Sequence, residues 1–142
     1  MSEQELRLHR CCFTGHRPEK LKRAEEDIKI GLEKAILKAI SDGYTTFITG
    51  MARGVDIWAG QIVLKLRQTN PELRLIAALP YLGCDSRWSA NWRKQYADVL
   101  EAANLVQSIS TKCSVASFQK RDEWMVLCKA SHNTNYGKQI VM

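Results

Sequence analysis

Residues 44–67 read YTTFITGMARGVDIWAGQIVLKLR, and this stretch decides the fold class. Its first six residues are all β-branched or aromatic, which predicts a strand over 44–49. A short loop bounded by Gly50 and Gly54 follows. From Val55 onward, apolar residues recur three and four positions apart, which predicts a helix over 55–66. A strand that passes through a glycine loop into a helix is the building unit of α/β proteins.

The same alternation runs along the rest of the chain. Strands are expected at 8–13, 73–79 and 105–109, with a further short one at 139–142, and helices at 25–42, 88–103 and 114–129. Gly43 is well placed to end the first of these helices, because glycine favours the backbone conformation of a helix C-terminus. Short connections between alternating elements imply right-handed βαβ units. We therefore predict a single α/β domain spanning 1–142, with a mainly parallel sheet and helices on both faces.

Composition and charge narrow the class of protein. The 142 residues are 45% hydrophobic and 25% charged, which is typical of a globular domain rather than a disordered chain. No apolar run is long enough to span a bilayer, and MSEQELRLHR at the N-terminus lacks the apolar stretch of a secretory signal. We expect a soluble cytoplasmic protein with no membrane partner. The net charge of +6 suggests an anionic partner, and nucleic acid, a nucleotide and phosphate all fit, although part of this charge is expected on solvated helix faces.

The five cysteines give no metal-binding pattern. There is no CxxC motif, and the three histidines are scattered. Cys11 and Cys12 are adjacent, so their side chains alternate across the predicted strand and cannot readily share a metal. We expect buried free thiols, and neither a metal nor a cofactor.

In a parallel sheet, the ligand site lies beyond the carboxyl ends of the strands. This rule selects the loops at 14–22, 50–56, 80–87 and 110–114.

The loop after the second predicted strand is the strongest of these candidates. Its two glycines, Gly50 and Gly54, allow close approach of the backbone and positive φ angles. The following helix points its first N–H groups and its positive dipole end into the loop, which suits an anion. Arg53 adds a guanidinium suited to phosphate, and Asp56 either accepts from a ribose hydroxyl or caps the helix. The predicted ligand-binding residues here are Gly50, Met51, Ala52, Arg53, Gly54 and Asp56.

The loop after the first predicted strand contributes Thr14, Gly15, His16 and Arg17. Gly15 permits a tight turn. His16 is suited to donate to phosphate, to stack on a base or to take part in acid–base chemistry, or else it bonds a nearby backbone carbonyl. Arg17 precedes Pro18 in an extended segment and either faces the same crevice or is solvated.

Aromatic residues follow the third predicted strand. Pro80 ends this strand, and Tyr81 beyond it is the best candidate for stacking on a ligand. Trp88 and Trp92 lie four apart on the predicted helix, where packing in the core explains them more simply than stacking. In the last long predicted helix, Phe118, Met125 and Cys128 are expected on one side.

Two further observations concern charge and catalysis. Lys120 and Arg121 are interpreted as solvated residues of the last long helix. The chain has no GxSxG or GKS/GKT motif and no complete GxGxxG fingerprint. No carboxylates are spaced as a catalytic pair, and we predict no catalytic residue.

The candidate loops resemble a known family. CCFTGHRPEKL at 11–21 and FITGMARGVDIWAGQIVLKLR at 47–67 are similar to two motifs of the YpsA-like family of the SLOG superfamily. The TGMARGVD core also resembles the glycine loop of the DNA-processing protein A branch. ALPYLGCDSRWS at 78–89 is similar to the third strand of the family, and QKRDEWMV at 119–126 resembles its RNRYMV-type helix.

The resemblance implies a Rossmann-like, doubly wound fold and a nucleotide-type ligand over residues 15–17 and 50–56. The C-terminus departs from the family. After Val126 the usual next strand and its GGT-type turn are absent, and residues 133–142 look like a compressed final helix and strand. A shortened sheet is expected to expose an edge that a second copy of the chain covers, giving a homodimer or larger homo-oligomer.

Three functions remain open from the sequence. The first is binding of a nucleotide or nucleotide-derived ligand, such as an ADP-ribose-like molecule, by a sensor or sequestering protein. The second is hydrolysis of an N-glycosidic or phosphate bond, as in lonely-guy relatives within the superfamily, although the loss of the GGT-type turn disfavours it. The third is binding of single-stranded nucleic acid, which the positive charge favours slightly. We expect binding rather than catalysis.

Overall fold

A computed structural model describes residues 9–15, 17–110, 115–128 and 138–141. Within these ranges, five strands form one sheet in the order β4-β3-β2-β1-β5, and every neighbouring pair is parallel. The strands are β1 (Arg10–Thr14), β2 (Thr46–Thr49), β3 (Arg74–Tyr81), β4 (Leu105–Ser110) and β5 (Lys138–Val141). The helices are α2 (Glu25–Ser41), α3 (Val55–Arg67), α4 (Ala90–Ala102) and α5 (Val115–Cys128), with a short 3-10 helix η1 (Pro18–Lys20) after β1.

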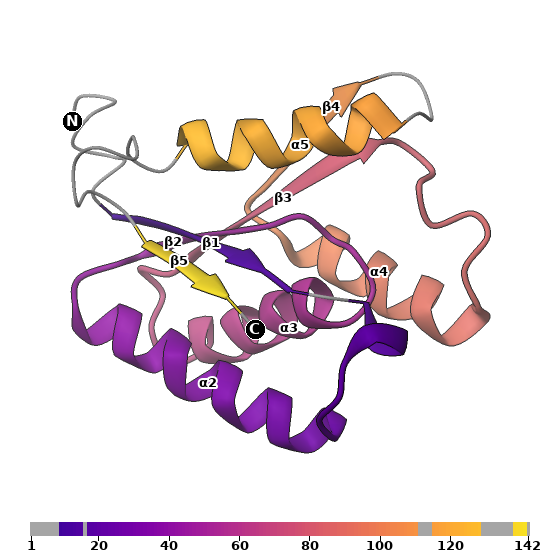
Figure 1. Cartoon of the computed structure of the whole chain (residues 1–142). Helices are drawn as coiled ribbons and strands as arrows, with labels where there is room; N and C mark the ends of the chain where they lie inside the picture. Colours follow the sequence, from indigo (N-terminus) through magenta and orange to yellow (C-terminus); the bar gives the residue numbers. More distant parts are fainter. Residues whose placement is uncertain (1–8, 16, 111–114, 129–137, 142) are drawn as a thin grey trace.

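The helices cover both faces of the sheet, as predicted. Figure 1 shows α2, α3 and α4 together on one face and α5 alone on the other. α3 is central, because it packs on β1, β2 and β3 and lies between α2 and α4. The strands from β1 to β4 follow one another across the sheet, and β5 returns to the far side of β1. Right-handed crossovers then require the helix of the return connection to lie on the opposite face.

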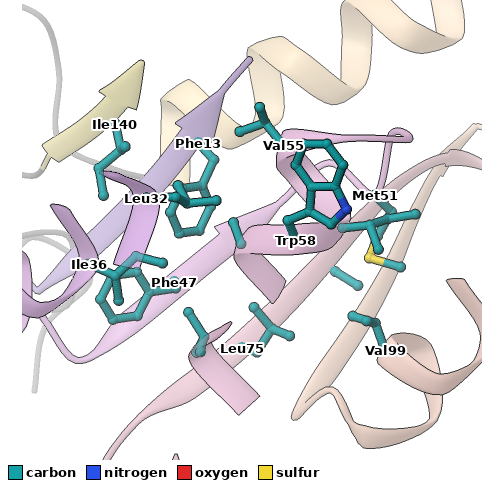
Figure 2. Packing of buried hydrophobic residues seen from close by; sticks show 14 of the residues in the cluster. Phe13, Leu32, Ile36, Phe47, Met51, Val55, Trp58, Leu75, Val99 and Ile140 are labelled. Atoms are coloured by element: carbon teal, nitrogen blue, oxygen red, sulfur yellow. The ribbon is translucent and has the colours of Figure 1, made fainter. Parts of the chain in front are cut away.

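The central strands β1, β2 and β3 contribute side chains to two separate hydrophobic cores, one on each face of the sheet. Side chains alternate across a strand, so Cys11 and Phe13 point toward α2 and α3, whereas Cys12 packs with Met125 of α5. The larger core includes Phe47 and Phe13, whose rings stack with their centroids 5.9 Å apart. Figure 2 shows this cluster. Cys11 and Cys12 are buried on opposite faces as thiols rather than as disulfides, as the sequence predicts.

Element boundaries differ from the prediction by one or two residues, and two of these differences concern Pro80 and Trp88. Pro80 lies inside β3, which continues to Tyr81. At this point β3 pairs only with β4, because its pairing with β2 ends at Ala77, and proline is tolerated where one side of a strand is unpaired. Trp88 lies before α4 rather than in it. The helix starts after Ser89, whose Oγ accepts from the backbone N–H of Trp92 at 3.4 Å and so caps the helix.

The residues that α5 buries also differ from those that the sequence predicts. Ser117, Arg121 and Met125 are buried at successive fourth positions, whereas Phe118 is 41% exposed. Phe118 precedes Met125 by seven positions and so lies on the same side of the helix, as predicted, but at the exposed margin of that side. The side chain of Cys128 lies outside the described part of the structure. Within the described ranges, none of the helices has the length and apolar character that crossing a membrane requires.

Candidate functional site

The loops after β1, β2 and β3 meet α5 at the carboxyl edge of the sheet and enclose a pocket of about 130 Å³. The pocket is lined by Arg17, Gly50, Met51, Ala52, Arg53, Pro80, Cys84, Trp88, Phe118 and Arg121. Six of these are among the predicted ligand-binding residues. Of the fourth candidate loop, residues 111–114 lie outside the described residues.

Hydrogen bonds and one glycine fix the loop between β2 and α3. The hydroxyl of Thr49 donates to the carbonyl of Asp56 at 2.7 Å and accepts from the N–H of Met51 at 3.3 Å. Gly54 is the N-cap of α3 and has a φ of 91°, so it adopts the positive φ that the sequence predicts for a glycine at this position. Met51 is buried at φ 60°, a left-handed conformation that non-glycine residues seldom adopt. Such strain persists where surrounding contacts hold it, often at functional sites.

Gly50 is needed for close approach rather than for its φ angle. A Cβ atom built on Gly50 would lie 2.9 Å from Oδ2 of Asp56 and 3.1 Å from the guanidinium of Arg121. Any side chain at this position would push apart the two charged groups that pack against the loop.

Arg121 reaches across the edge of the sheet to this loop. Its Nη1 donates to the carbonyl of Gly50 at 2.6 Å, and its Nε donates to Asp122 at 2.6 Å. The guanidinium also lies 5.6 Å from the ring centroid of Phe118. The interpretation of Arg121 as a solvated helix residue is wrong, because only 8% of it is exposed. Lys120 beside it is exposed, as predicted.

Asp56 lies behind the loop rather than in the pocket lining. Its Oδ2 accepts from the backbone N–H of Ala52 at 3.3 Å, and its side chain is buried. Burial raises the pKa of Asp56 from its ordinary value of 3.8 to about 6. The charge of Arg121 and the Ala52 hydrogen bond oppose this rise, and Asp122 adds to it. Contact with a ribose hydroxyl stays a prediction, whereas the observed bond holds the loop.

Because the pKa of Asp56 is higher in the folded state, this group makes stability depend on pH. Between about pH 4 and 6 the folded protein binds more protons than the unfolded chain, so stability falls as the pH rises through this window. We expect a fall on the order of 2 to 3 kcal/mol in wild type, measured by urea denaturation from pH 4 to 8, that is absent in Asp56→Asn. Asp98→Asn, which removes an exposed carboxylate paired with Lys94, serves as the control. An unchanged pH profile in Asp56→Asn would contradict this assignment.

The loop after β1 brings a second guanidinium to the pocket. Arg17 lines the pocket and remains exposed to solvent. Two residues later, Glu19 of η1 accepts from Nη1 of Arg53 at 2.5 Å. The pKa of Glu19 is lowered, first by a hydrogen bond from its own backbone amide and then by Arg53 and Arg17. An acidic side chain therefore occupies one donor of Arg53 at the pocket.

Of the other predicted residues in the loop after β1, only Gly15 can be assigned a structural role. Gly15 packs against α3, since a Cβ there would lie 2.5 Å from Cβ of Val55. Its φ is not in the left-handed region, so packing rather than turn geometry requires the glycine. His16 and the side chain of Thr14 lie outside the described part of the chain.

The loop after β3 contributes a half-buried thiol and an indole. Sγ of Cys84 lies 3.4 Å from Oη of Tyr96, and burial raises the pKa of this thiol. Trp88 packs edge-on against Tyr96, with 5.4 Å between the ring centroids. Trp88 and Trp92 both pack against the larger core, as predicted, and Trp88 also lines the pocket. Tyr81 is not part of the pocket lining, and its ring lies perpendicular to that of Phe118.

Sequence reasoning missed four lining residues: Cys84, Trp88, Phe118 and Arg121. Arg121 carried a usable signal, because Ser117, Arg121 and Met125 share one helical face, and because it lies in the segment that resembles the RNRYMV-type helix.

Across residues 9–15, 17–110, 115–128 and 138–141, no three His, Cys, Asp or Glu side chains come together as metal ligands.

A parallel sheet covered on both faces, with a loop-lined pocket at its carboxyl edge, defines a Rossmann-like α/β protein. A sequence model named YpsA and described as the YspA SLOG family matches residues 11–136. The match covers most of the chain, and the chain belongs to this family.

Curated relatives agree with the family. A UPF0398 protein of Halalkalibacterium halodurans is 37% identical over 101 residues, which cover 70% of this chain and 53% of the relative. A UPF0398 protein of Bacillus pumilus is 26% identical over 121 residues, covering 80% of this chain and 65% of the relative. One from Ligilactobacillus salivarius is 33% identical over 93 residues, covering 66% and 44%. The chain therefore spans only about half to two thirds of the length of these relatives.

Proposed function

We propose that this protein binds a nucleotide or nucleotide-derived ligand of the ADP-ribose type, with a phosphate group in the pocket at the carboxyl edge of the sheet. The observation that carries the proposal is the convergence of three arginines, Arg17, Arg53 and Arg121, from three separate segments on one small pocket. Guanidinium groups bind phosphate through charge-assisted hydrogen bonds. Glu19 and Asp122 each pair with one of the three, and the remaining donors are available to a ligand.

The backbone supports an anion in the same position. The pocket is lined by the loop at 50–53 that leads into the N-terminus of α3, and the positive dipole end of this helix favours an anion nearby. The N–H groups of Met51 and Ala52 already donate to Thr49 and Asp56. These two amides therefore shape the loop, and the phosphate is assigned to the arginines, near the positive end of the helix dipole.

The size of the pocket limits what it can enclose. A volume of about 130 Å³ is well below the roughly 300 Å³ at which sites begin to bury a whole drug-sized ligand. In this proposal the pocket encloses a phosphate-bearing part of the ligand, and the remainder lies along the edge of the sheet.

Arg53→Ala tests the proposal by removing one charge-assisted bond to phosphate. We expect the affinity for ADP-ribose and for ADP, measured by calorimetry, to fall by about ten- to a hundredfold. Arg17→Ala is expected to act in the same direction. Glu19→Gln is expected to raise affinity about two- to fivefold, because the ligand then no longer competes with an exposed carboxylate for Arg53.

Lys34→Ala and Lys65→Ala are the matched controls. Both remove a positive charge from a helix away from the loops, and Lys65 pairs with Glu33 at 3.2 Å. Equal weakening by the controls would mean that general positive charge drives binding. Binding of single-stranded DNA, measured alongside at several salt concentrations, would then identify nucleic acid as the better candidate ligand. Loop variants that bind like wild type would refute the site.

Two further proposals concern the biological role of the protein and its assembly. We propose a sensor or sequestering protein, since the residues of the pocket include cationic groups but no paired carboxylates suited to acid–base catalysis. We also propose self-association. β4 forms one edge of the sheet, and Leu105 and Val106 on it are 49% and 40% exposed, which favours burial against a second copy.

A further inference from the structure

The lining of the pocket changes from cationic to aromatic side chains along the carboxyl edge of the sheet. Arg17 and Arg53 follow β1 and β2, which are neighbours. Trp88 and Phe118 follow β3 and β4, which continue the sheet in the same direction. The cationic end and the aromatic end are therefore separated along the sheet, and Arg121 joins them by contacting both Gly50 and the ring of Phe118.

We propose that Phe118, with Trp88, forms a stacking subsite for a planar nucleobase at the aromatic end of the pocket. The inference rests on the proposed phosphate site, because it uses the arginines to orient the ligand. A nucleotide has an anionic end and an aromatic end, and its phosphate over β1 and β2 directs its base toward β3 and β4.

Both aromatic rings are held in place by other residues. The ring of Phe118 meets Tyr81 perpendicularly, with 5.9 Å between the centroids, and the Arg121 guanidinium lies over it. Trp88 meets Tyr96 in the same perpendicular way. Because these neighbours fix the rings before a ligand arrives, a base loses little additional side-chain freedom when it stacks on them.

Exposure of the Phe118 ring fits a ligand contact better than core packing. The residue is 41% exposed, although it lines the pocket and its helix has a buried face through Ser117, Arg121 and Met125. The small enclosed volume gives the base no place deeper in the protein. The exposed part of Phe118 is therefore the surface on which the base lies, and the subsite selects ligands with an aromatic base over sugar phosphates that lack one.

The test compares adenosine 5′-monophosphate with ribose 5-phosphate, which differ by the base alone. Stacking on an aromatic side chain contributes about 1–3 kcal/mol per base, so wild type is expected to bind the nucleotide about five- to a hundredfold more tightly by calorimetry. Phe118→Leu keeps an apolar side chain but removes the ring. In this variant the preference is expected to disappear, because the nucleotide loses the stacking contact and ribose 5-phosphate has no base to lose it.

A spectroscopic readout separates stacking from a structural role. The chain has four tryptophans, and the nucleotide is expected to quench fluorescence in wild type while ribose 5-phosphate does not. Trp88→Phe is expected to lose this nucleotide-dependent quenching. Leu37→Ala, at an exposed apolar residue of α2, is the control that should change neither measurement.

The outcomes distinguish the two proposals. Equal affinity of wild type for the two probes would overturn the base subsite and leave the phosphate site standing. Equal weakening of both probes by Phe118→Leu would also overturn the subsite, because the ring would then act on the whole pocket. If wild type binds neither probe nor ADP-ribose, the phosphate site fails and the subsite fails with it.

Discussion

Gly15→Ala is expected to lower the free energy of unfolding by about 3 kcal/mol, at the upper end of what overpacking costs. The added Cβ would lie 2.5 Å from Cβ of Val55 and 2.6 Å from its Cγ1. Val55 is fully buried and is the first residue of α3, so relief requires the end of β1 and the start of α3 to move apart. Thermal unfolding should show a fall in Tm of roughly 10 °C.

Gly43→Ala is the matched control for this prediction. Gly43 has φ 100°, and a Cβ there meets no atom within 4 Å, so only backbone strain of roughly 1 kcal/mol is expected. The double variant Gly15→Ala with Val55→Gly removes the three atoms nearest to the added Cβ, all of which belong to Val55. It should be more stable than the sum of the two single effects predicts. If Gly15→Ala costs no more than Gly43→Ala, close packing does not explain the glycine.

Arg121→Met is expected to lower the free energy of unfolding by about 2 to 4 kcal/mol and to abolish anion binding. The variant removes the donor to the Gly50 carbonyl and the positive charge that favours ionised Asp56. The pKa of Asp56 then rises further, so the cost of ionising this buried carboxyl extends to higher pH. The stability deficit relative to wild type should therefore be larger at pH 8 than at pH 5.

Lys120→Met controls for loss of a positive charge from the same helix, because Lys120 is the exposed neighbour of Arg121. Its stability should stay within about 0.5 kcal/mol of wild type in urea denaturation. A deficit in Arg121→Met that is equal at both pH values would show that the guanidinium acts without reference to Asp56.

The sequence predicts the helices and strands well, because a sheet buried on both faces requires short apolar strands, and helices packed on it require apolar residues at regular spacing. The strands are short apolar runs, and α3 starts at Val55 as its spacing indicates. Gly43 ends α2 at φ 100°, as a glycine in that position predicts. These features depend on neighbours within one turn or one strand, so local patterns carry them.

The candidate site is predicted only in part, because its remaining residues depend on distant contacts. Arg121 meets Gly50 across 71 positions of sequence, and the helical spacing that it shares with Ser117 and Met125 does not identify this distant partner. Asp56 is an ordinary first-turn acid in the sequence, whereas folding buries it behind the loop. Gly15 indicates a turn, yet the contact that requires glycine is with the side chain of Val55.

The strand order also bears on how the chain assembles during synthesis. From β1 to β4, each new strand pairs with the strand that emerged just before it, so these units can form one after another. β5 instead pairs with β1, at the opposite end of the sequence. The pocket needs α5, which precedes β5, and its arginine on the Gly50 carbonyl. The nascent chain can therefore form its first four strands before its binding site, and the site is completed only when α5 docks.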